Sequence, residues 1–211
     1  WKPLDFPNTS AFIQLWLNLA KENGLPGIHF VGLQQNIENG NIPLHKILTR
    51  DIPSQGSMLY KEILDNGYSA VHGRGYNRAE FLSRPLYEIV FRGICNRLFN
   101  HHIISKCDQR DINKHLYTEE DKWENVYPML FPQWDRTPRS GKKARIYTHS
   151  TPEVFGEQID QVLDLVEHKQ FEHKIVFLTS WNEWAEGNYV EPDLKFGRGY
   201  LDILQKKLLK E

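Results

Sequence analysis

The stretch Lys174-Ile-Val-Phe-Leu-Thr-Ser-Trp-Asn-Glu-Trp-Ala-Glu-Gly187 contains the strongest signals for both fold and function in this chain. Its first half is continuously apolar from Ile175 to Leu178, which is typical of a strand buried on both faces of a parallel sheet. Its second half is polar, and carboxylates alternate there with tryptophans. In folds built on parallel sheets, functional side chains follow the carboxyl ends of the strands. The stretch therefore predicts a buried strand over 174–179 that leads directly into a functional site.

The same pattern of buried strands between helices extends toward the N-terminus. Apolar segments predict further strands at 27–33, 68–71 and 126–131, and apolar residues at helical spacing predict helices near 10–23, 60–66, 85–99, 152–166 and 199–209. This alternation indicates an α/β fold with a parallel sheet covered on both faces. We expect the C-terminal part, about four βα units, of a (β/α)8 TIM barrel. An independent doubly wound sheet of four strands is the alternative, and it would leave its edges less well buried.

Composition limits the classes of partner. The 211 residues are 40% hydrophobic and 25% charged, and they carry a net charge of −1 with neutral histidines. This balance gives no electrostatic reason to expect a nucleic acid or an anionic membrane as partner. No apolar stretch approaches the roughly 18 to 20 residues that a transmembrane segment requires. Cys95 and Cys107 are too few for a disulfide framework, so free thiols in a reducing, cytoplasmic compartment are expected.

Cofactor and metal motifs are weak. The segment Gly73-Arg74-Gly75 lacks the third glycine and the following helix start of a dinucleotide-binding loop. Side chains with metal-ligand chemistry occur without an ordered metal spacing at His101, His102, Cys107 and His115. We therefore expect no cofactor and no metal. His72 follows a predicted strand and is either a residue of the site or a surface histidine.

The polar segment after 174–179 has the composition of a sugar site. Glycosidic-bond chemistry uses two carboxyl groups, and sugar rings stack on aromatic faces. Glu183 and Glu186 are the catalytic candidates, because a turn would bring side chains at this spacing to roughly 5 to 6 Å, within reach of the two-carboxyl geometry. The substrate-binding candidates in this segment are Asn182, Trp181, Trp184, Tyr189 and Glu191. A structural cap over the core is the alternative interpretation of the same segment.

A second polar block, Phe131-Pro-Gln-Trp-Asp-Arg-Thr-Pro-Arg139, follows the predicted strand at 126–131. Trp134 and Asp135 lie just past the strand end, where they could contact a sugar. Arg139, with its neighbour Arg136, could pair with acids of the site or with an anionic group of the ligand.

The order of these residues resembles a known family. Asn182-Glu-Trp-x-Glu-Gly187 followed by Val190-Glu-Pro192 is similar to the C-terminal signature of family-99 glycoside hydrolases, and Glu186-Gly-Asn-Tyr-Val-Glu-Pro-Asp193 is similar to their WbsX branch. The block at 131–139 resembles the upstream Trp-Asp-x-Thr-x-Arg block of the same proteins. That branch comprises family-99-like proteins from bacterial polysaccharide loci, commonly labelled glycosyltransferases. The resemblance covers most of the chain.

The resemblance implies both architecture and chemistry. It implies eight βα units, so we expect a single domain over 1–211 that forms the C-terminal half of a barrel, with an insertion at about 73–125 and the N-terminal half outside this chain. It implies a retaining route in which Glu183 is base on the sugar's own 2-hydroxyl group and Glu186 is acid, then base. The hydrolases usually have histidine where this chain has Ala185, which leaves hydrolysis and transfer both open.

The expected partners are a glycan and a glycosyl donor or acceptor, in bacterial surface-polysaccharide (lipopolysaccharide and O-antigen) metabolism. The alternatives are a glycosyltransferase proper and a non-catalytic glycan-binding protein. Against the former, this chain has no Asp-x-Asp motif for a sugar nucleotide.

Overall fold

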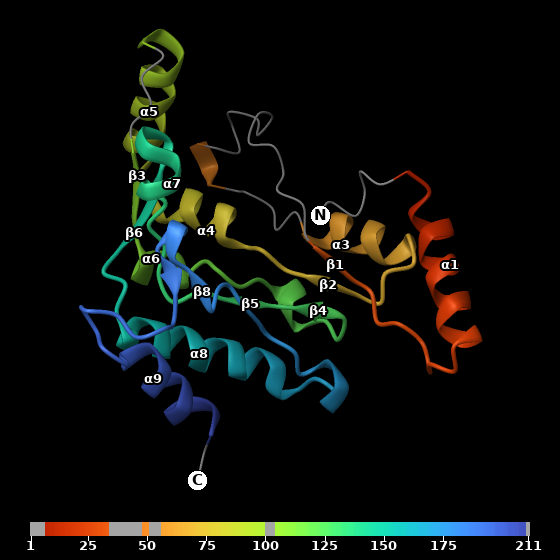
Figure 1. Ribbon diagram of the computed structural model, residues 1–211. Coiled ribbons are helices and arrows are strands. Elements are labelled where there is room, and N and C mark those ends of the chain that lie inside the picture. The colour runs from red at the N-terminus through yellow and green to blue at the C-terminus, as the bar shows by residue number, and fades with distance from the viewer. Residues whose placement is uncertain (1–6, 34–47, 51–55, 100–103, 210–211) are drawn as a thin grey trace. The chain divides into compact units, whose positions relative to one another are not determined.

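The computed structural model describes residues 7–33, 48–50, 56–99 and 104–209. They form two compact units, each assembled from three separate segments. Figure 1 labels helices and strands of both units. The first unit comprises Trp1–Arg74, Thr118–Pro128 and Lys169–Ile175, and the second comprises Gly75–Tyr117, Met129–His168 and Val176–Glu211.

The first unit is built on a three-stranded parallel sheet. Its strands are β1 (Val31–Leu33), β2 (Ala70–His72) and β4 (Val126–Tyr127), in the order β1-β2-β4. Helix α3 (Gly56–Asp65) packs on this sheet and places Ile63 in one buried cluster with Val71 and Val126. A side chain at Gly32 would lie 2.4 Å from Ile63, so glycine permits this close helix packing. The unit also contains α1 (Thr9–Glu22) and the short 3₁₀ turns η2 (Glu119–Lys122) and η4 (Phe171–His173).

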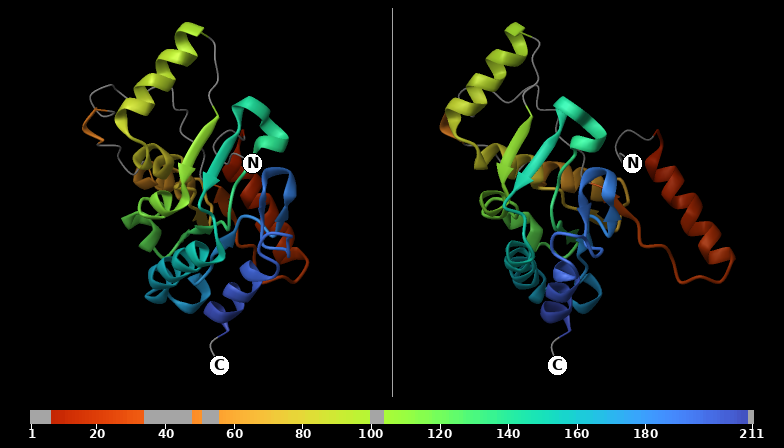
Figure 2. Two further views of the ribbon diagram at one scale, coloured as in Figure 1. Left: turned by 90° about the vertical axis from the view of Figure 1, so that its left-hand side faces the viewer. Right: turned by 60° about the vertical axis from the view of Figure 1, so that its left-hand side comes forward.

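The second unit contains two parallel strand pairs and a hairpin. Strand β3 (Ser105–Asp108) pairs with β6 (Arg145–Thr148), and the two lie side by side in Figure 2. Strand β5 (Met129–Leu130) pairs with β7 (Phe177–Leu178), and β8 (Asn182–Glu183) forms an antiparallel hairpin with β9 (Asn188–Tyr189). The helical elements are α4 (Tyr76–Ser83), α5 (Leu86–Phe99), α6 (Gln109–Asn113), α7 (Thr137–Ser140), η3 (Gly141–Lys143), α8 (Pro152–Glu167), η5 (Trp184–Glu186) and α9 (Gly199–Leu208).

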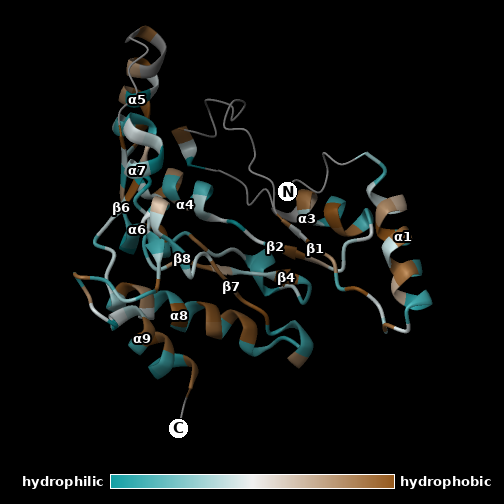
Figure 3. Cartoon of the chain, viewed as in Figure 1, coloured by the Kyte–Doolittle hydropathy of each residue, from teal (hydrophilic) through white to brown (hydrophobic). Residues whose placement is uncertain are grey.

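Strand β5 is central to this unit because both of its faces are buried. Leu130 joins one apolar cluster with Phe155 and Ile159 of α8 and Tyr200 of α9. Its chain neighbours Met129 and Phe131 join a second cluster with the aromatic rings of Tyr76, Trp134 and Tyr147. Helix α8 begins where the Thr151 side chain accepts a hydrogen bond from the backbone N–H of Val154, with Pro152 in the first turn. Its apolar residues alternate with hydrophilic ones along the ribbon in Figure 3, as expected of a helix with one buried face.

The sequence predicted the main helices and most strands. Helices α1, α3, α5, α8 and α9 confirm the predicted helical segments, and β1, β2 and β7 lie within or next to predicted strands. A single strand over 126–131 was wrong: Pro128 separates β4, which pairs with β2, from β5, which pairs with β7. The strand at 174–179 is shorter than predicted and pairs through Phe177 and Leu178. Strands β3, β6, β8 and β9 were not predicted. The fold is mixed α/β with small parallel sheets.

Candidate functional site

The candidate site is built on the hairpin that follows β7. Asn182 pairs with Tyr189 and Glu183 with Asn188, and η5 forms the connection between the two strands. Gly187 closes the turn with φ 54°, a conformation that glycine adopts without strain. A Cβ atom there would lie 3.0 Å from the backbone oxygen of Asp135. The hairpin tip can therefore approach the 131–139 block closely.

Backbone hydrogen bonds fix this approach. The N–H of Asp135 donates to the carbonyl oxygen of Glu186 at 2.9 Å. On either side of Asp135, the carbonyl of Trp134 accepts from Tyr147 N–H and the N–H of Arg136 donates to the carbonyl of Arg145. The 134–136 segment is thus held between β6 and the hairpin tip.

The carboxylate of Glu186 is the most heavily engaged group of the site. Its Oε2 accepts a hydrogen bond from Trp134 Nε1 at 3.0 Å, and its Oε1 lies 2.9 Å from Arg139 Nη1 and 3.1 Å from Arg136 Nη2. The Glu186 side chain is 12% exposed, whereas that of Arg139 is 57% exposed. Three donors from the 131–139 block therefore hold one carboxylate. The side chain of one of them, Arg139, is largely exposed to solvent.

The other catalytic candidate, Glu183, lies on the same hairpin. It is half-buried at the end of β8 and immediately precedes η5. Opposite it, Asn188 is buried, and its side-chain oxygen accepts a hydrogen bond from the backbone N–H of Ser180. Both carboxylates thus belong to one hairpin whose base and tip are fixed by separate hydrogen bonds.

Two aromatic rings of the hairpin form a stacked pair. The rings of Trp184 and Tyr189 lie with centroids 3.7 Å apart and planes inclined by 16°. Trp184 Nε1 donates to Glu191 Oε2 at 2.6 Å, and the Tyr189 hydroxyl donates to Asp193 at 3.2 Å. Trp184 remains 47% exposed, so the stacked pair presents apolar ring surface to solvent. Trp181 is 54% exposed, and Asn182 is exposed as well.

The other predicted residues of the 131–139 block have structural partners. Trp134 is 4% exposed and packs among the rings of Tyr76, Phe131 and Tyr147, so only its N–H reaches the site. Asp135 Oδ1 accepts hydrogen bonds from the backbone N–H and the hydroxyl of Thr137, which starts α7. Of the two roles considered for Arg136 and Arg139, the structure shows pairing with an acid of the site.

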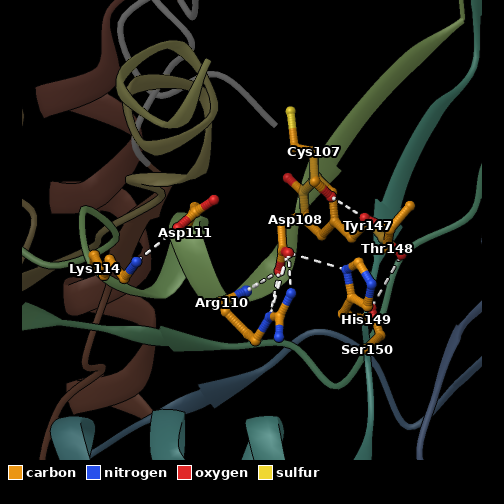
Figure 4. Close-up of polar contacts among 9 residues, drawn as sticks. All are labelled: Cys107, Asp108, Arg110, Asp111, Lys114, Tyr147, Thr148, His149 and Ser150. Atoms are coloured by element: carbon orange, nitrogen blue, oxygen red, sulfur yellow. Dashed lines mark hydrogen bonds and ion pairs between the residues drawn. The ribbon is translucent and has the colours of Figure 1, made fainter. Parts of the chain in front are cut away.

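Sequence reasoning missed two polar clusters of the second unit. Glu80 is 5% exposed, accepts a hydrogen bond from the Tyr147 hydroxyl at 2.5 Å and lies 2.6 Å from Arg145 Nε. Burial raises the pKa of Glu80, while the Arg145 guanidinium opposes that rise. The other cluster joins Asp108 to His149 (Figure 4). Their partners are far apart in sequence, so no local motif signals either cluster.

His72, at the end of β2 in the first unit, is buried, and its Nδ1 lies 3.2 Å from the Tyr127 carbonyl oxygen. Burial lowers its pKa to about 4. Among the described residues, no cluster of three or more His, Cys, Asp or Glu side chains could hold a metal ion. His101 and His102 lie outside the described residues. No helix within the described ranges is long and apolar enough to cross a bilayer.

Comparisons with known proteins find a solved structure of similar fold and curated relatives of similar sequence. A solved structure described as a glycoside hydrolase-like protein superposes with a TM-score of 0.51 at 13% identity, over 94% of this chain and 49% of that one. Two curated relatives, both named uncharacterized protein WxcX, come from Xanthomonas campestris pv. campestris strains B100 and ATCC 33913. Each is 32% identical over 107 residues, which make up 49% of this chain and 15% of the relative. This chain thus spans a small part of the relatives and about half of the solved structure.

The family model described as glycosyltransferase WbsX matches residues 1–204, nearly the whole chain. This match confirms the resemblance to the WbsX branch that the two sequence blocks indicated. The chain belongs to the glycosyltransferase WbsX family.

Proposed function

We propose that the full-length protein makes or breaks glycosidic bonds, with Glu183 and Glu186 as its two reacting carboxyl groups. The observation that carries this proposal is their position on one hairpin directly after β7, with Glu186 held by three donors. Membership of the WbsX family and the hydrolase-like fold of a solved structure support the same chemistry. The substrate is expected to be a glycan of bacterial surface polysaccharide metabolism.

The strand pairings support a partial barrel. In the first unit β1, β2 and β4 pair in chain order, and in the second unit β5 pairs with β7, all in parallel, while β3 and β6 form a separate parallel pair. Successive parallel strands in chain order are the arrangement of a (β/α)8 barrel. We therefore propose that residues 1–211 are one domain, the C-terminal half of such a barrel. The insertion at 73–125 then contributes α4, α5, β3, α6 and η2.

The proposed roles follow the retaining route implied by the family resemblance. Glu183 takes the proton of the sugar's 2-hydroxyl group, whose oxygen attacks the anomeric carbon, while Glu186 protonates the departing oxygen. In the second step Glu186 takes a proton from the incoming water or sugar hydroxyl, which opens the anhydro ring, and Glu183 returns its proton to the 2-oxygen. Protonation of Glu186 removes its ion pairs with both Arg136 and Arg139, and Arg139, whose side chain is the more exposed of the two, is the partner proposed to move away when substrate binds.

The remaining candidates are assigned to binding. The stacked rings of Trp184 and Tyr189, together with Trp181, offer faces for sugar C–H groups. Asn182, Glu191 and Asp135 supply polar groups that can bind sugar hydroxyls. Trp134 and Arg139 position Glu186.

A second candidate function, glycan binding without catalysis, has one observation in its favour. The three donors stabilise Glu186 as an ionised carboxylate in a fixed position. A binding site requires only such a fixed hydrogen-bond acceptor, with no change of protonation. The stacked rings of Trp184 and Tyr189 would serve a binder equally well.

Fluoride release from a panel of hexosyl fluorides separates these functions in the full-length protein. Glu183→Gln and Glu186→Gln keep the side-chain shape but cannot exchange the proton, so each should slow release by roughly 10²- to 10⁴-fold. Glu157→Gln, at an exposed position of α8, is the matched control and should leave the rate unchanged. If Glu183→Gln and Glu186→Gln both keep full activity, the two carboxyl groups are not catalytic. If the unaltered protein binds methyl glycosides but releases no fluoride, the binding function holds instead.

The corresponding 2-deoxy-2-fluoro sugars test the route within the same experiment. They lack the 2-hydroxyl group that Glu183 would deprotonate, so they should bind without releasing fluoride and without labelling the protein. A covalent glycosyl adduct on Glu183, detected by mass spectrometry, would show direct nucleophilic attack and exclude the anhydro-sugar route.

A further inference from the structure

Asp108 and His149 meet at the carboxyl edge of the β3–β6 pair. Asp108 is the last residue of β3 and pairs in register with Thr148, the last residue of β6. His149 follows immediately, and its Nδ1 lies 3.0 Å from Asp108 Oδ2 (Figure 4). The two residues are 41 positions apart in sequence and are brought together by the parallel register of the two strands.

Arg110 fixes the Asp108 carboxylate. Its backbone N–H and Nε donate to Asp108 Oδ1 at 2.9 and 3.0 Å, and its Nη2 donates to Oδ2 at 2.5 Å. These bonds to Arg110 lower the pKa of Asp108 to about 2, so the carboxylate is ionised at neutral pH. An ionised carboxylate only accepts hydrogen bonds, so Nδ1 of His149 carries the proton that faces it. In neutral His149 the lone pair is then on Nε2.

The backbone of His149 is held in an uncommon conformation. Its φ of 55° lies in the left-handed region, which few residues other than glycine adopt. Hydrogen bonds fix its neighbours: the Thr148 hydroxyl donates to the Cys107 carbonyl, and the Ser150 hydroxyl donates to the Tyr147 carbonyl. Residues with a strained backbone conformation persist only where the surrounding structure holds them. They occur often at binding and catalytic sites. The His149 side chain is nevertheless 61% exposed, so its ring is fixed on one side and accessible on the other.

The pair of Asp108 and His149, called the dyad from here on, is connected to the candidate site through β6. Asp135, whose N–H bonds to the Glu186 carbonyl, bridges to Ile146 of β6. His149 follows the last residue of the same strand, three positions after Ile146. Strand β6 therefore connects the segment that bonds to Glu186 with the Asp108–His149 pair.

We propose that Asp108 and His149 form a second sugar-binding site, in which Nε2 of His149 accepts a hydrogen bond from a hydroxyl group of the sugar that receives the glycosyl unit. This inference rests on the proposed glycosidic-bond function. Asp108 orients the ring, Arg110 holds Asp108, and no proton leaves the bound hydroxyl group at this site. Glu186 remains the group that activates the attacking hydroxyl.

His149→Asn tests this site while keeping the backbone conformation and the contact with Asp108. Asparagine adopts the left-handed conformation readily, and its amide N–H can replace Nδ1 as donor to Asp108, but it has no counterpart of Nε2. The control is His168→Asn, at an exposed histidine that follows the C-terminal end of α8. The full-length protein is used, with hexosyl fluorides as donors and methyl hexosides as acceptors.

Loss of one hydrogen bond to the acceptor should raise its KM about tenfold and lower the yield of disaccharide accordingly. Fluoride release without acceptor should stay unchanged in His149→Asn, and His168→Asn should change neither rate. Asp108→Asn should shift the acceptor KM in the same direction, because an amide can donate to Nδ1 and favour the tautomer with a protonated Nε2. Unaltered acceptor KM in both dyad variants would overturn the proposal.

A chemical footprint supplies a readout that does not require turnover. Diethyl pyrocarbonate acylates unprotonated imidazole nitrogens, and peptide mass spectrometry reports the modified fraction at each histidine. Methyl hexosides that bind the dyad should protect His149 but not His168. Failure of the proposed function would show as absent fluoride release by the unaltered protein, whereas failure of the second site would show as fluoride release with an unprotected His149.

Discussion

At the scale of single residues, the candidate site depends on one carboxylate whose partners come from another part of the chain. Trp134 contributes its N–H from within the core, and Arg136 and Arg139 approach Glu186 from α7 and its start. The ion pair with the exposed Arg139 adds little to stability, because solvent screens it and the long side chain loses freedom. In the proposed mechanism this ion pair opens when substrate binds, whereas the buried indole of Trp134 stays in place.

Asp108 offers a test at the same scale. Its folded-state pKa of about 2 lies below the ordinary value of 3.8, mainly because of the hydrogen bonds from Arg110. Its contribution to stability is therefore fully present above about pH 4 and is lost as pH falls toward 2. In urea unfolding between pH 4.5 and 2, Asp108→Asn should lose less stability on acidification than the unaltered chain. Asp164→Asn, at an exposed position of α8, is the control and should follow the unaltered profile; equal slopes for Asp108→Asn would contradict the assignment.

At the scale of elements, the sequence predicted those helices and strands that have a regular local pattern of apolar residues. Helix α8 combines a capping threonine, a first-turn proline and regular apolar spacing, so its start and its buried face were predicted correctly. Strands β3 and β6 read Ser-Lys-Cys-Asp and Arg-Ile-Tyr-Thr, too short and too polar to be recognised as buried strands. Their pairing spans about forty residues, so the Asp108–His149 contact had no local signal. Glu183 and Glu186 were recognisable because their motif lies within one short segment.

Pro128 shows a further limit of local patterns. The apolar run at 126–131 resembles one strand, and the proline was expected to occupy a bulge or a position without a ladder bond. The structure instead divides the run at the proline, so that its two halves pair with different neighbours, β2 and β7. Apolar content alone could not predict this division, since both halves are equally buried.

Helix α5 shows that helical periodicity does not establish burial. Its apolar residues form a stripe at spacings of four, three and four, yet the stripe is largely exposed: Tyr87 77%, Phe91 59%, Ile94 47% and Leu98 69%. Such an apolar stripe promotes association. Phe91→Glu with Ile94→Lys should therefore reduce self-association of the isolated chain in sedimentation velocity. Because exposed substitutions usually change the free energy of unfolding by within about 0.5 kcal/mol, the melting temperature should stay nearly constant.

The half-buried Ile89, on the same helix, is the matched contrast. Ile89→Lys removes apolar contacts from a partly packed face and should lower the melting temperature while leaving association in place. If the Phe91 and Ile94 double variant unfolds instead, the stripe is packed against another part of the protein.

At the scale of the whole molecule, two buried groups of the first unit should give opposing responses to pH. Burial raises the pKa of Asp121 to about 6, from an ordinary value of 3.8, and lowers that of His72 to about 4, from 6.5. Between pH 4 and 6 the folded state holds more protons at Asp121, so that group makes stability fall as pH rises. At His72 the unfolded state holds more protons, so that group makes stability rise. Each contribution is on the order of 3 kcal/mol over its full range.

The effects of Asp121 and His72 on stability between pH 4 and 6 should nearly cancel. A variant that removes one titrating group should therefore reveal the pH dependence due to the other. Asp121→Asn keeps an acceptor for the Thr118 backbone N–H but cannot titrate, so only the His72 response remains. In this variant the stability of the β1-β2-β4 sheet should rise steadily from pH 4 to 6.5, whereas in the unaltered chain it should stay nearly level. Hydrogen exchange of the sheet amides, corrected for intrinsic pH dependence, measures this difference. Asp160→Asn, at an exposed position of α8, should leave the level profile intact. A level profile in Asp121→Asn would mean that the two buried groups do not control the pH response of this unit.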